Sequence, residues 1–212
     1  MMQYLTSSCL FIMIILFCSG CSIQKMTSIP SQISNQKIDT TTTEHILGTG
    51  AWIFVEYADT ECPYSKEYHL MLETLLPNYE GKIRWQYKHF PLNQHMKKAI
   101  LEAEAVECAG AQEKFWEYLN LLYKKTPSNN ELPQKDLLSF AKEIGLNEKE
   151  FETCTGNASY HNKVLSDLAD AQKQGALGTP FSLLIDEQGT VVEIFDGLYS
   201  VKELEEIFKK YQ

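Results

Sequence analysis

Positive charge is scarce in this sequence of 212 residues. It has 19 lysine and arginine residues against 28 aspartate and glutamate residues, which gives a formal net charge of −9. Basic patches interleaved with aromatic residues, the pattern of nucleic-acid-binding surfaces, are missing. The chain also lacks an internal repeat of roughly 20 to 50 residues. These absences argue against a nucleic-acid partner and against a repeat architecture.

Metal-binding patterns are missing as well. Beyond residue 45 the chain has no Cys-x-x-Cys pair and no histidine cluster with ligand spacing, so we expect neither a structural zinc nor another cofactor. Six cysteines are present, three of them near the N-terminus: Cys9, Cys18 and Cys21. The other three are Cys62, Cys108 and Cys154. Outside the cytosol, an odd number predicts one disulfide and one free, reactive thiol.

The N-terminal segment reads as a leader. Residues 10 to 17 form an unbroken apolar run that ends at Cys18-Ser19-Gly20-Cys21. This length suits a signal-peptide core and is short for a bilayer span. The small residues before Cys21 are similar to a lipoprotein cleavage site, although residues 1 to 8 lack lysine and arginine. We predict a signal peptide over residues 1 to 21 with lipidation at Cys21; an ordinary signal peptide or an uncleaved anchor is the alternative.

The rest of the chain divides into a linker and one domain. Residues 22 to 45 are rich in Ser, Thr, Gln and Asn and have no apolar periodicity, which predicts a polar tether. Residues 46 to 212 are long enough for one domain with its own core. We therefore expect an extracytoplasmic domain, membrane-anchored in the periplasm or at the cell surface.

Strand and helix patterns give the order of elements in this domain. Strands are predicted at residues 51–57, 82–90, 181–185 and 190–195, because these runs are apolar and β-prone. Helical periodicity is found at residues 64–75, 97–123, 133–145, 147–155, 158–174 and 200–211. The order βαβ, helices, ββα predicts one mixed α/β sheet with the helical block as a lid.

The segment Cys62-Pro63-Tyr64-Ser65 follows the first strand and opens a helix. Proline suits the first helical position, where its missing N–H costs nothing. The free N–H groups and the dipole of a helix N-terminus favour an anion, here the Cys62 thiolate that performs thiol–disulfide exchange. Asp59 and Glu61 oppose this effect through like charge. An inert N-cap residue is the alternative for Cys62.

Four separated motifs resemble those of the DsbA-like thioredoxin-fold oxidoreductases: FVEYADTECPYSKEYH, YKHFPLNQH, EAEAVECAGAQEKFWEYLNLLY and ALGTPFSLLIDEQG. The resemblance runs from about His45 to the C-terminus. It implies a thioredoxin-like fold with an inserted helical subdomain over about residues 92 to 175. It also implies that Cys62 is the catalytic thiol.

The same resemblance implies a site for extended polypeptides beside Cys62, formed by Pro63, Tyr64, Thr179 and Pro180. Thr179-Pro180 is similar to the cis-proline loop of the fold, where the backbone can pair with an added strand. An ordinary trans proline that opens an edge strand is the alternative.

Cys108 and Cys154 lie where members of this family often carry cysteines, so the resemblance implies a structural disulfide in the helical block. A loop of some 45 residues closed in this way would add about 4 kcal/mol in the chain-entropy model. Two buried free thiols are one alternative. A role for one of them in resolving a mixed disulfide at Cys62 is another.

Ser65 departs from the family, which has its second, resolving cysteine there. The Ser65 hydroxyl is placed to donate to a Cys62 thiolate but cannot form a disulfide. An external thiol, from a small molecule or a partner protein, must then resolve Cys62. The sequence predicts a monothiol thiol–disulfide oxidoreductase or isomerase-like protein that acts on protein thiols or mixed disulfides. A redox-inactive peptide-binding module or holdase is the alternative.

Three histidines remain near these elements. His69 falls seven residues after Cys62, which is two helical turns or about 10 Å and too far for a direct base. His89 and His95 flank the end of the second strand, and we interpret them as surface histidines, with a place in the groove as the alternative.

Overall fold

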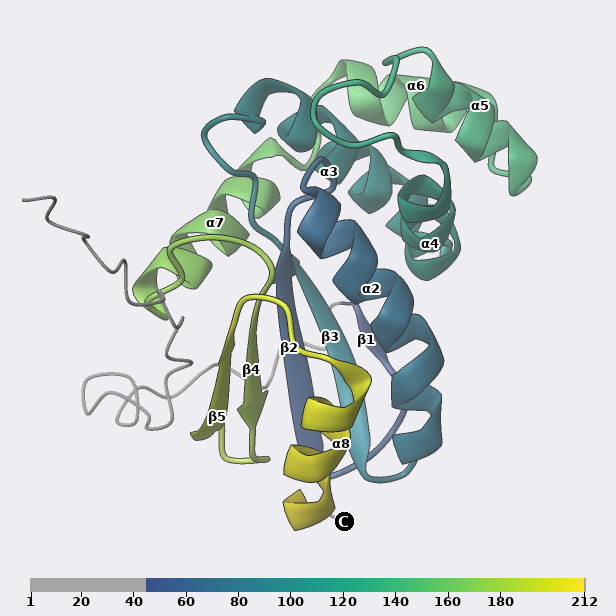
Figure 1. The fold of residues 1–212 in the computed structure, drawn as a ribbon. Helices are drawn as coiled ribbons and strands as arrows, with labels where there is room; N and C mark the ends of the chain where they lie inside the picture. The colour runs from purple at the N-terminus through teal and green to yellow at the C-terminus, as the bar shows by residue number, and fades with distance from the viewer. Residues whose placement is uncertain (1–44, 212) are drawn as a thin grey trace, which may run out of the picture.

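The computed structural model describes residues 45 to 211, so the predicted signal peptide, Cys21 and nearly all of the predicted linker lie outside the described residues. Five strands form one mixed sheet in the order β1-β3-β2-β4-β5 (Figure 1). They are β1 (Ile46–Leu47), β2 (Trp52–Ala58), β3 (Ile83–His89), β4 (Phe181–Ile185) and β5 (Val191–Asp196). β3 runs parallel to β2, and β4 runs antiparallel to both β2 and β5. The expected βαβ unit and hairpin therefore share one sheet.

Helices cover both faces of this sheet and continue beyond one of its ends. They are α2 (Pro63–Leu75), α3 (Met96–Gly110), α4 (Phe115–Lys125), α5 (Asp136–Glu143), α6 (Glu148–Gly156), α7 (His161–Lys173) and α8 (Val201–Phe208). α2 and α8 pack on one face through a core that includes Phe54, Leu72 and Phe208. α7 covers the other face through a core that includes Val55 and Ala171. α3 to α6 form the inserted helical subdomain at the upper end in Figure 1.

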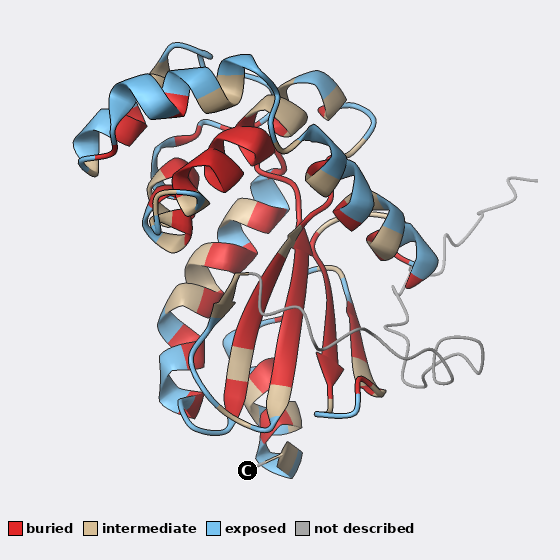
Figure 2. Ribbon diagram, turned by 180° about the vertical axis from the view of Figure 1, so that it is seen from behind, coloured by how far each residue is buried: buried red, intermediate tan, exposed pale blue. Residues whose placement is uncertain are grey.

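The central strand explains why the sheet is covered on both faces. Six of the seven residues of β2 are buried, and Figure 2 shows the central strands buried over most of their length. A parallel strand of this composition needs apolar partners on each side. Side-chain caps mark the start of two helices. The Asn147 side chain accepts from Glu150 N at the start of α6, and Ser200 with Glu203 forms a capping box at the start of α8.

The helical stretch predicted over residues 97 to 123 is wrong in one respect, because the structure has two helices there. α3 ends at Gly110 and α4 begins at Phe115. Between them, Glu113 has a φ of 62°, a left-handed conformation that no helix continues through. The apolar stripe hid this break because both helices contribute side chains to the same core cluster. The short strand β1 was not predicted either. No helix within residues 45 to 211 has the length and apolar character needed to cross a membrane.

Candidate active site

Cys62 is the N-cap residue of α2, at the carboxyl end of β2. Pro63 occupies the first turn, and Lys66 N donates to Cys62 O at 3.0 Å. The Cys62 side chain is buried, with 4% of its surface exposed. It is the free cysteine of the described chain. A strand that ends one turn before a proline-started helix thus places this sulfur at the positive end of the helix dipole.

The loop before β4 faces this sulfur. Cys62 Sγ lies 3.6 Å from Thr179 O, so the thiol can donate to that carbonyl. The Thr179-Pro180 peptide bond is cis. Two segments more than a hundred residues apart in the chain therefore meet at Cys62. The arrangement puts a main-chain acceptor beside the one free thiol of residues 45 to 211.

Ser65 lies one turn along α2 and is fully buried. Its Oγ accepts a hydrogen bond from Asp59 N at 3.3 Å. Within the described residues no hydrogen bond joins Ser65 to the Cys62 sulfur, so the expected donation to Cys62 is not present in this state. The hydroxyl instead ties the start of the helix to the turn after β2.

That turn is held by the carboxylate of Asp59. The carboxylate accepts hydrogen bonds from the backbone N–H groups of Glu61 and Leu92, each at 2.7 Å. It also pairs with His95 Nδ1 at 3.0 Å. Burial raises the pKa of Asp59, and the hydrogen bonds and the His95 charge offset part of this effect. His95 is 7% exposed and His89 is 1% exposed. The interpretation of both as surface histidines is therefore wrong, because buried carboxylates pair with them.

His69 points into the core below α2. Its ring nitrogens contact Glu56 Oε2 at 3.0 Å and Asn120 Oδ1 at 2.9 Å. Trp85 Nε1 donates to the same Glu56 oxygen at 3.0 Å. Glu56 and His69 are both fully buried. The hydrogen bonds of Glu56, His69 and Asn120 therefore connect the sheet to α2 and α4. Glu56 was not identified from the sequence.

Three large apolar side chains that lie close in sequence to Cys62, Thr179 or Gly197 are exposed. Tyr64 follows Cys62 by two residues and is 61% exposed, while Leu177 precedes Thr179 by two residues and is 94% exposed. Leu198 is 37% exposed and follows Gly197, whose N donates to Pro180 O. Leu177 and Leu198 were not singled out from the sequence. An exposed leucine alone means little, but these three flank the same loop and helix start.

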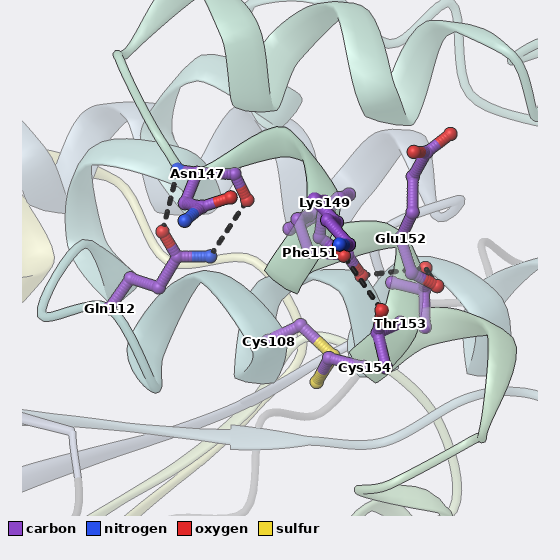
Figure 3. Close-up of a disulfide and its surroundings, with 9 residues drawn as sticks. Cys108, Gln112, Asn147, Lys149, Phe151, Glu152, Thr153 and Cys154 are labelled. Atoms are coloured by element: carbon purple, nitrogen blue, oxygen red, sulfur yellow. Dashed lines mark hydrogen bonds between the residues drawn. A yellow bond between two sulfur atoms is a disulfide. The ribbon is translucent and has the colours of Figure 1, made fainter.

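Cys108 and Cys154 are joined by a disulfide that links α3 to α6. The two cysteines are 46 residues apart in sequence, and their Cα atoms are 5.9 Å apart. Figure 3 shows that α6 is held near the same place by a second contact. There Gln112 Oε1 accepts from Asn147 N at 2.8 Å and Gln112 Nε2 donates to Asn147 O at 3.3 Å. Cys108 and Cys154 are therefore not two free thiols in this structure.

An ionic cluster lies between β3, α3 and α7. His45 Nε2 and His89 Nε2 contact the two oxygens of Glu107 at 2.8 and 3.1 Å. His89, Glu107 and Asp167 each have an atom of the kind that binds metal ions, and these atoms lie within 4.8 Å of one another. The spacing of the three residues in the sequence did not reveal this cluster. Lys163 Nζ lies 2.8 Å from Asp167 and 3.6 Å from Glu107. An ammonium group thus supplies positive charge within this cluster.

We expect Glu107→Gln to destabilise the protein by about 3 kcal/mol at neutral pH, because it leaves charged partners in a buried site. Burial opposes ionisation of Glu107, but His45 and His89 outweigh it and hold the pKa well below its usual range. The contribution is therefore present above about pH 4.5 and is lost as the pH falls further. Urea unfolding at several pH values measures this. A difference between variant and wild type that stays constant down to about pH 2 would contradict the assignment.

The fold and this site define the class of protein. A family model described as Thioredoxin matches residues 40–210, and the structural neighbours include thiol–disulfide oxidoreductases of the DsbA type. The chain belongs to the DsbA-like thioredoxin-fold family. Among solved structures, Pseudomonas aeruginosa DsbA2 is 25% identical with a TM-score of 0.65, and the match covers 78% of this chain and 92% of that one. Wolbachia pipientis α-DsbA1 is 20% identical with a TM-score of 0.65, covering 78% and 89%, and shows the same fold.

Curated relatives match over a shorter range. The Na⁺/H⁺ antiporter NhaA 3 of Salinispora tropica is 32% identical over 126 residues, which is 59% of this chain and 19% of the antiporter. The antiporter NhaA of Herminiimonas arsenicoxydans is 29% identical over 139 residues, which is 65% of this chain and 21% of that protein. The chain thus matches about a fifth of the length of these relatives. Their names describe ion transport by those proteins alone.

Proposed function

We propose that the protein is an extracytoplasmic monothiol thiol–disulfide oxidoreductase whose reactive sulfur is Cys62. The observation that carries this proposal is the pairing of Cys62 at the start of α2 with a buried Ser65 one turn later. Serine cannot form a disulfide, so Cys62 exchanges with sulfur from outside the motif. The Thr179 carbonyl lies beside Cys62 Sγ and could pair with the backbone of a bound chain, which favours an extended polypeptide as the substrate.

The exchange proceeds in two steps, each of which breaks one disulfide bond and forms another. The Cys62 thiolate attacks one sulfur of a mixed disulfide, a new disulfide with Cys62 forms, and the other sulfur leaves as a thiolate. A second thiol, from a small molecule or a partner protein, then attacks the Cys62 disulfide and releases the Cys62 thiolate. Together these two steps transfer the disulfide bond to the second thiol and change no oxidation state overall. Complete reduction of a substrate disulfide needs one further exchange, in which another external thiol attacks the newly formed disulfide, so that two external thiols are oxidised to a disulfide.

The location outside the cytosol follows from the leader and belongs to this proposal. The apolar run at residues 10 to 17 and the small residues before Cys21 support export and a lipid anchor there. One structural disulfide and one free thiol beyond the leader suit an oxidising compartment. The polar residues 22 to 45 would separate the anchor from the site.

A redox-inactive peptide-binding protein is the second candidate. The exposure of Tyr64 and Leu177 on either side of the site favours it, because apolar side chains there would grip a chain without chemistry. Nothing in this surface requires a reactive sulfur. The reactivity of Cys62 therefore separates the two functions.

We expect Cys62 to react with iodoacetamide about tenfold faster than a model thiol at about pH 6.5, because the helix start favours the thiolate. Mass spectrometry of the alkylated peptide gives the rate constant. Cys62→Ala is the control and should show no alkylation of the peptide that contains position 62. A rate no faster than that of the model thiol would favour the peptide-binding protein instead.

A further inference from the structure

A cavity of about 240 Å³ lies at the edge of the sheet, between β1, the end of α2 and the start of β3. β1 is the edge strand and pairs with β3 (Figure 1). Leu76, which follows α2, lines the cavity. The 13 residues of α2 separate Leu76 from Cys62, a rise of about 20 Å along the helix. The cavity is therefore distinct from the site at Cys62.

Apolar side chains form much of the cavity wall. Leu76, Ile83 and Trp85 line it and are buried, whereas Leu47 of β1 lines it and is half-exposed. Trp85 Nε1 already donates to Glu56, so the indole offers an occupant its ring rather than its N–H group. Ligand sites combine such apolar walls with a few placed polar groups. These side chains suit a compact apolar group.

The charged side chains that line the cavity are both glutamates. Glu73 belongs to α2, and Glu80 lies between α2 and β3. Glu73 Oε1 accepts from Asn120 Nδ2 at 3.0 Å and from the exposed Lys124 Nζ at 2.7 Å. No lysine or arginine of residues 45 to 211 lines the cavity itself. Because Lys124 balances Glu73, Glu80 supplies the excess negative charge, which repels an anion and attracts a cation.

The carboxylate of Glu80 is held by the turn after β1. Its Oε1 accepts from Thr49 N at 3.1 Å and from Thr49 Oγ1 at 2.8 Å. Its Oε2 lies beside Gly48, where a Cβ atom would meet it at 2.8 Å. In the described part of the chain, no basic side chain pairs with Glu80. One oxygen of a fixed carboxylate thus keeps its capacity to accept from a donor.

We propose that this cavity binds a small organic cation, a protonated amine carried on a compact apolar body. The ammonium group donates to Glu80 Oε2, and the apolar body lies against Leu76, Ile83 and Trp85. The volume suits a ligand of about ten non-hydrogen atoms, near the small end of ligand sites. Binding here goes beyond the proposed function and does not depend on the reactivity of Cys62.

Benzylammonium chloride is the probe, because it carries a primary ammonium group on a single ring. Titration into the ¹⁵N-labelled protein at neutral pH should shift the amide resonances of Gly48 and Leu76 and the indole resonance of Trp85. We expect a dissociation constant of about 1 mM. Benzyl alcohol has the same ring without the charge and should bind about fivefold more weakly. Benzoate should leave these resonances unchanged.

Three variants separate the charged contact from the apolar one. Glu80→Gln keeps an oxygen for Thr49 and should weaken benzylammonium binding about fivefold while leaving benzyl alcohol unaffected. Leu47→Ala removes apolar surface and should weaken both probes about threefold. Glu117→Gln is the matched control, because it removes the same charge at an exposed position of α4 that does not line the cavity. Both affinities should then equal those of the wild type.

The wild type decides first. Equal affinities for benzylammonium and benzyl alcohol would overturn the proposal, because the carboxylate would then have no part in binding. Shifts confined to the surroundings of Cys62 and Thr179 would overturn it as well. So would calcium chloride that shifts the same resonances and displaces the probe, since the glutamates would then form a metal site. If Glu80→Gln alone disturbs the β1 resonances, the comparison of the two probes in wild type and Leu47→Ala decides the proposal.

Discussion

Ser65→Cys should convert the site into a dithiol oxidase. The substitution restores the second sulfur at a buried position one turn after Cys62, and cysteine differs little in size from serine. Pro63 still begins the helix, and the Thr179 carbonyl already lies 3.6 Å from Cys62 Sγ. With the variant supplied oxidised and in excess, we expect a reduced multi-disulfide protein to regain its disulfides without glutathione. The rate should exceed that of the wild type by about 100-fold, because an intramolecular thiol resolves at a high effective concentration.

Controls decide which sulfur acts. Ser65→Ala removes the hydroxyl without adding a sulfur and should gain no oxidase activity. The wild type should show slow exchange that needs added glutathione. Equal activity of wild type and Ser65→Cys without glutathione would mean that Cys108 or Cys154 already resolves Cys62. No activity from Ser65→Cys would mean that the groove serves binding alone, and either result defeats the monothiol proposal.

The features that could be predicted from the sequence are those with local causes. Val, Ile and Phe in β2 mark a buried strand, and Pro63 marks the start of α2 in the structure. The capping box at Ser200 and Glu203 begins α8 as the spacing indicates. The order of these elements then limits the sheet to a few arrangements. The fold follows because each local preference agrees with its neighbours.

The features that were missed depend on partners far along the chain. His89 and His95 looked like surface residues because Glu107 and Asp59, which bury and pair them, lie 18 and 36 residues away. Glu113 adopts a left-handed conformation that glycine or asparagine would have announced, and glutamate does not. A single sequence without a contact map carries no signal for these pairings.

The site shows the same division. The pattern of Cys62, Pro63 and Ser65 was visible, but the partner of the Ser65 hydroxyl was not, because Asp59 N competes for it only after the turn has formed. The sequence showed Glu61 only as a negative charge near Cys62, and the burial of its side chain was not predicted.

Replacing both cysteines of the helical subdomain should cost the most stability of any change considered. The disulfide closes a loop across 46 residues of sequence separation, which is worth about 4 kcal/mol in the chain-entropy model. We expect Cys108→Ala with Cys154→Ala to lower the free energy of unfolding in urea by about that amount and Tm by about 10 °C. Added reductant should destabilise the wild type to the same extent and leave the double variant unchanged.

Cys62→Ala is the matched control, because it removes the third sulfur and leaves the link between α3 and α6 intact. Its sensitivity to reductant should match that of the wild type. Gln112 and Asn147 form a second contact near the disulfide, so the double variant should still fold, with a lower free energy of unfolding than the wild type. A double variant as stable as the wild type would contradict a structural role. A double variant that is stable but no longer releases mixed disulfides from Cys62 would assign one of these sulfurs to resolution instead.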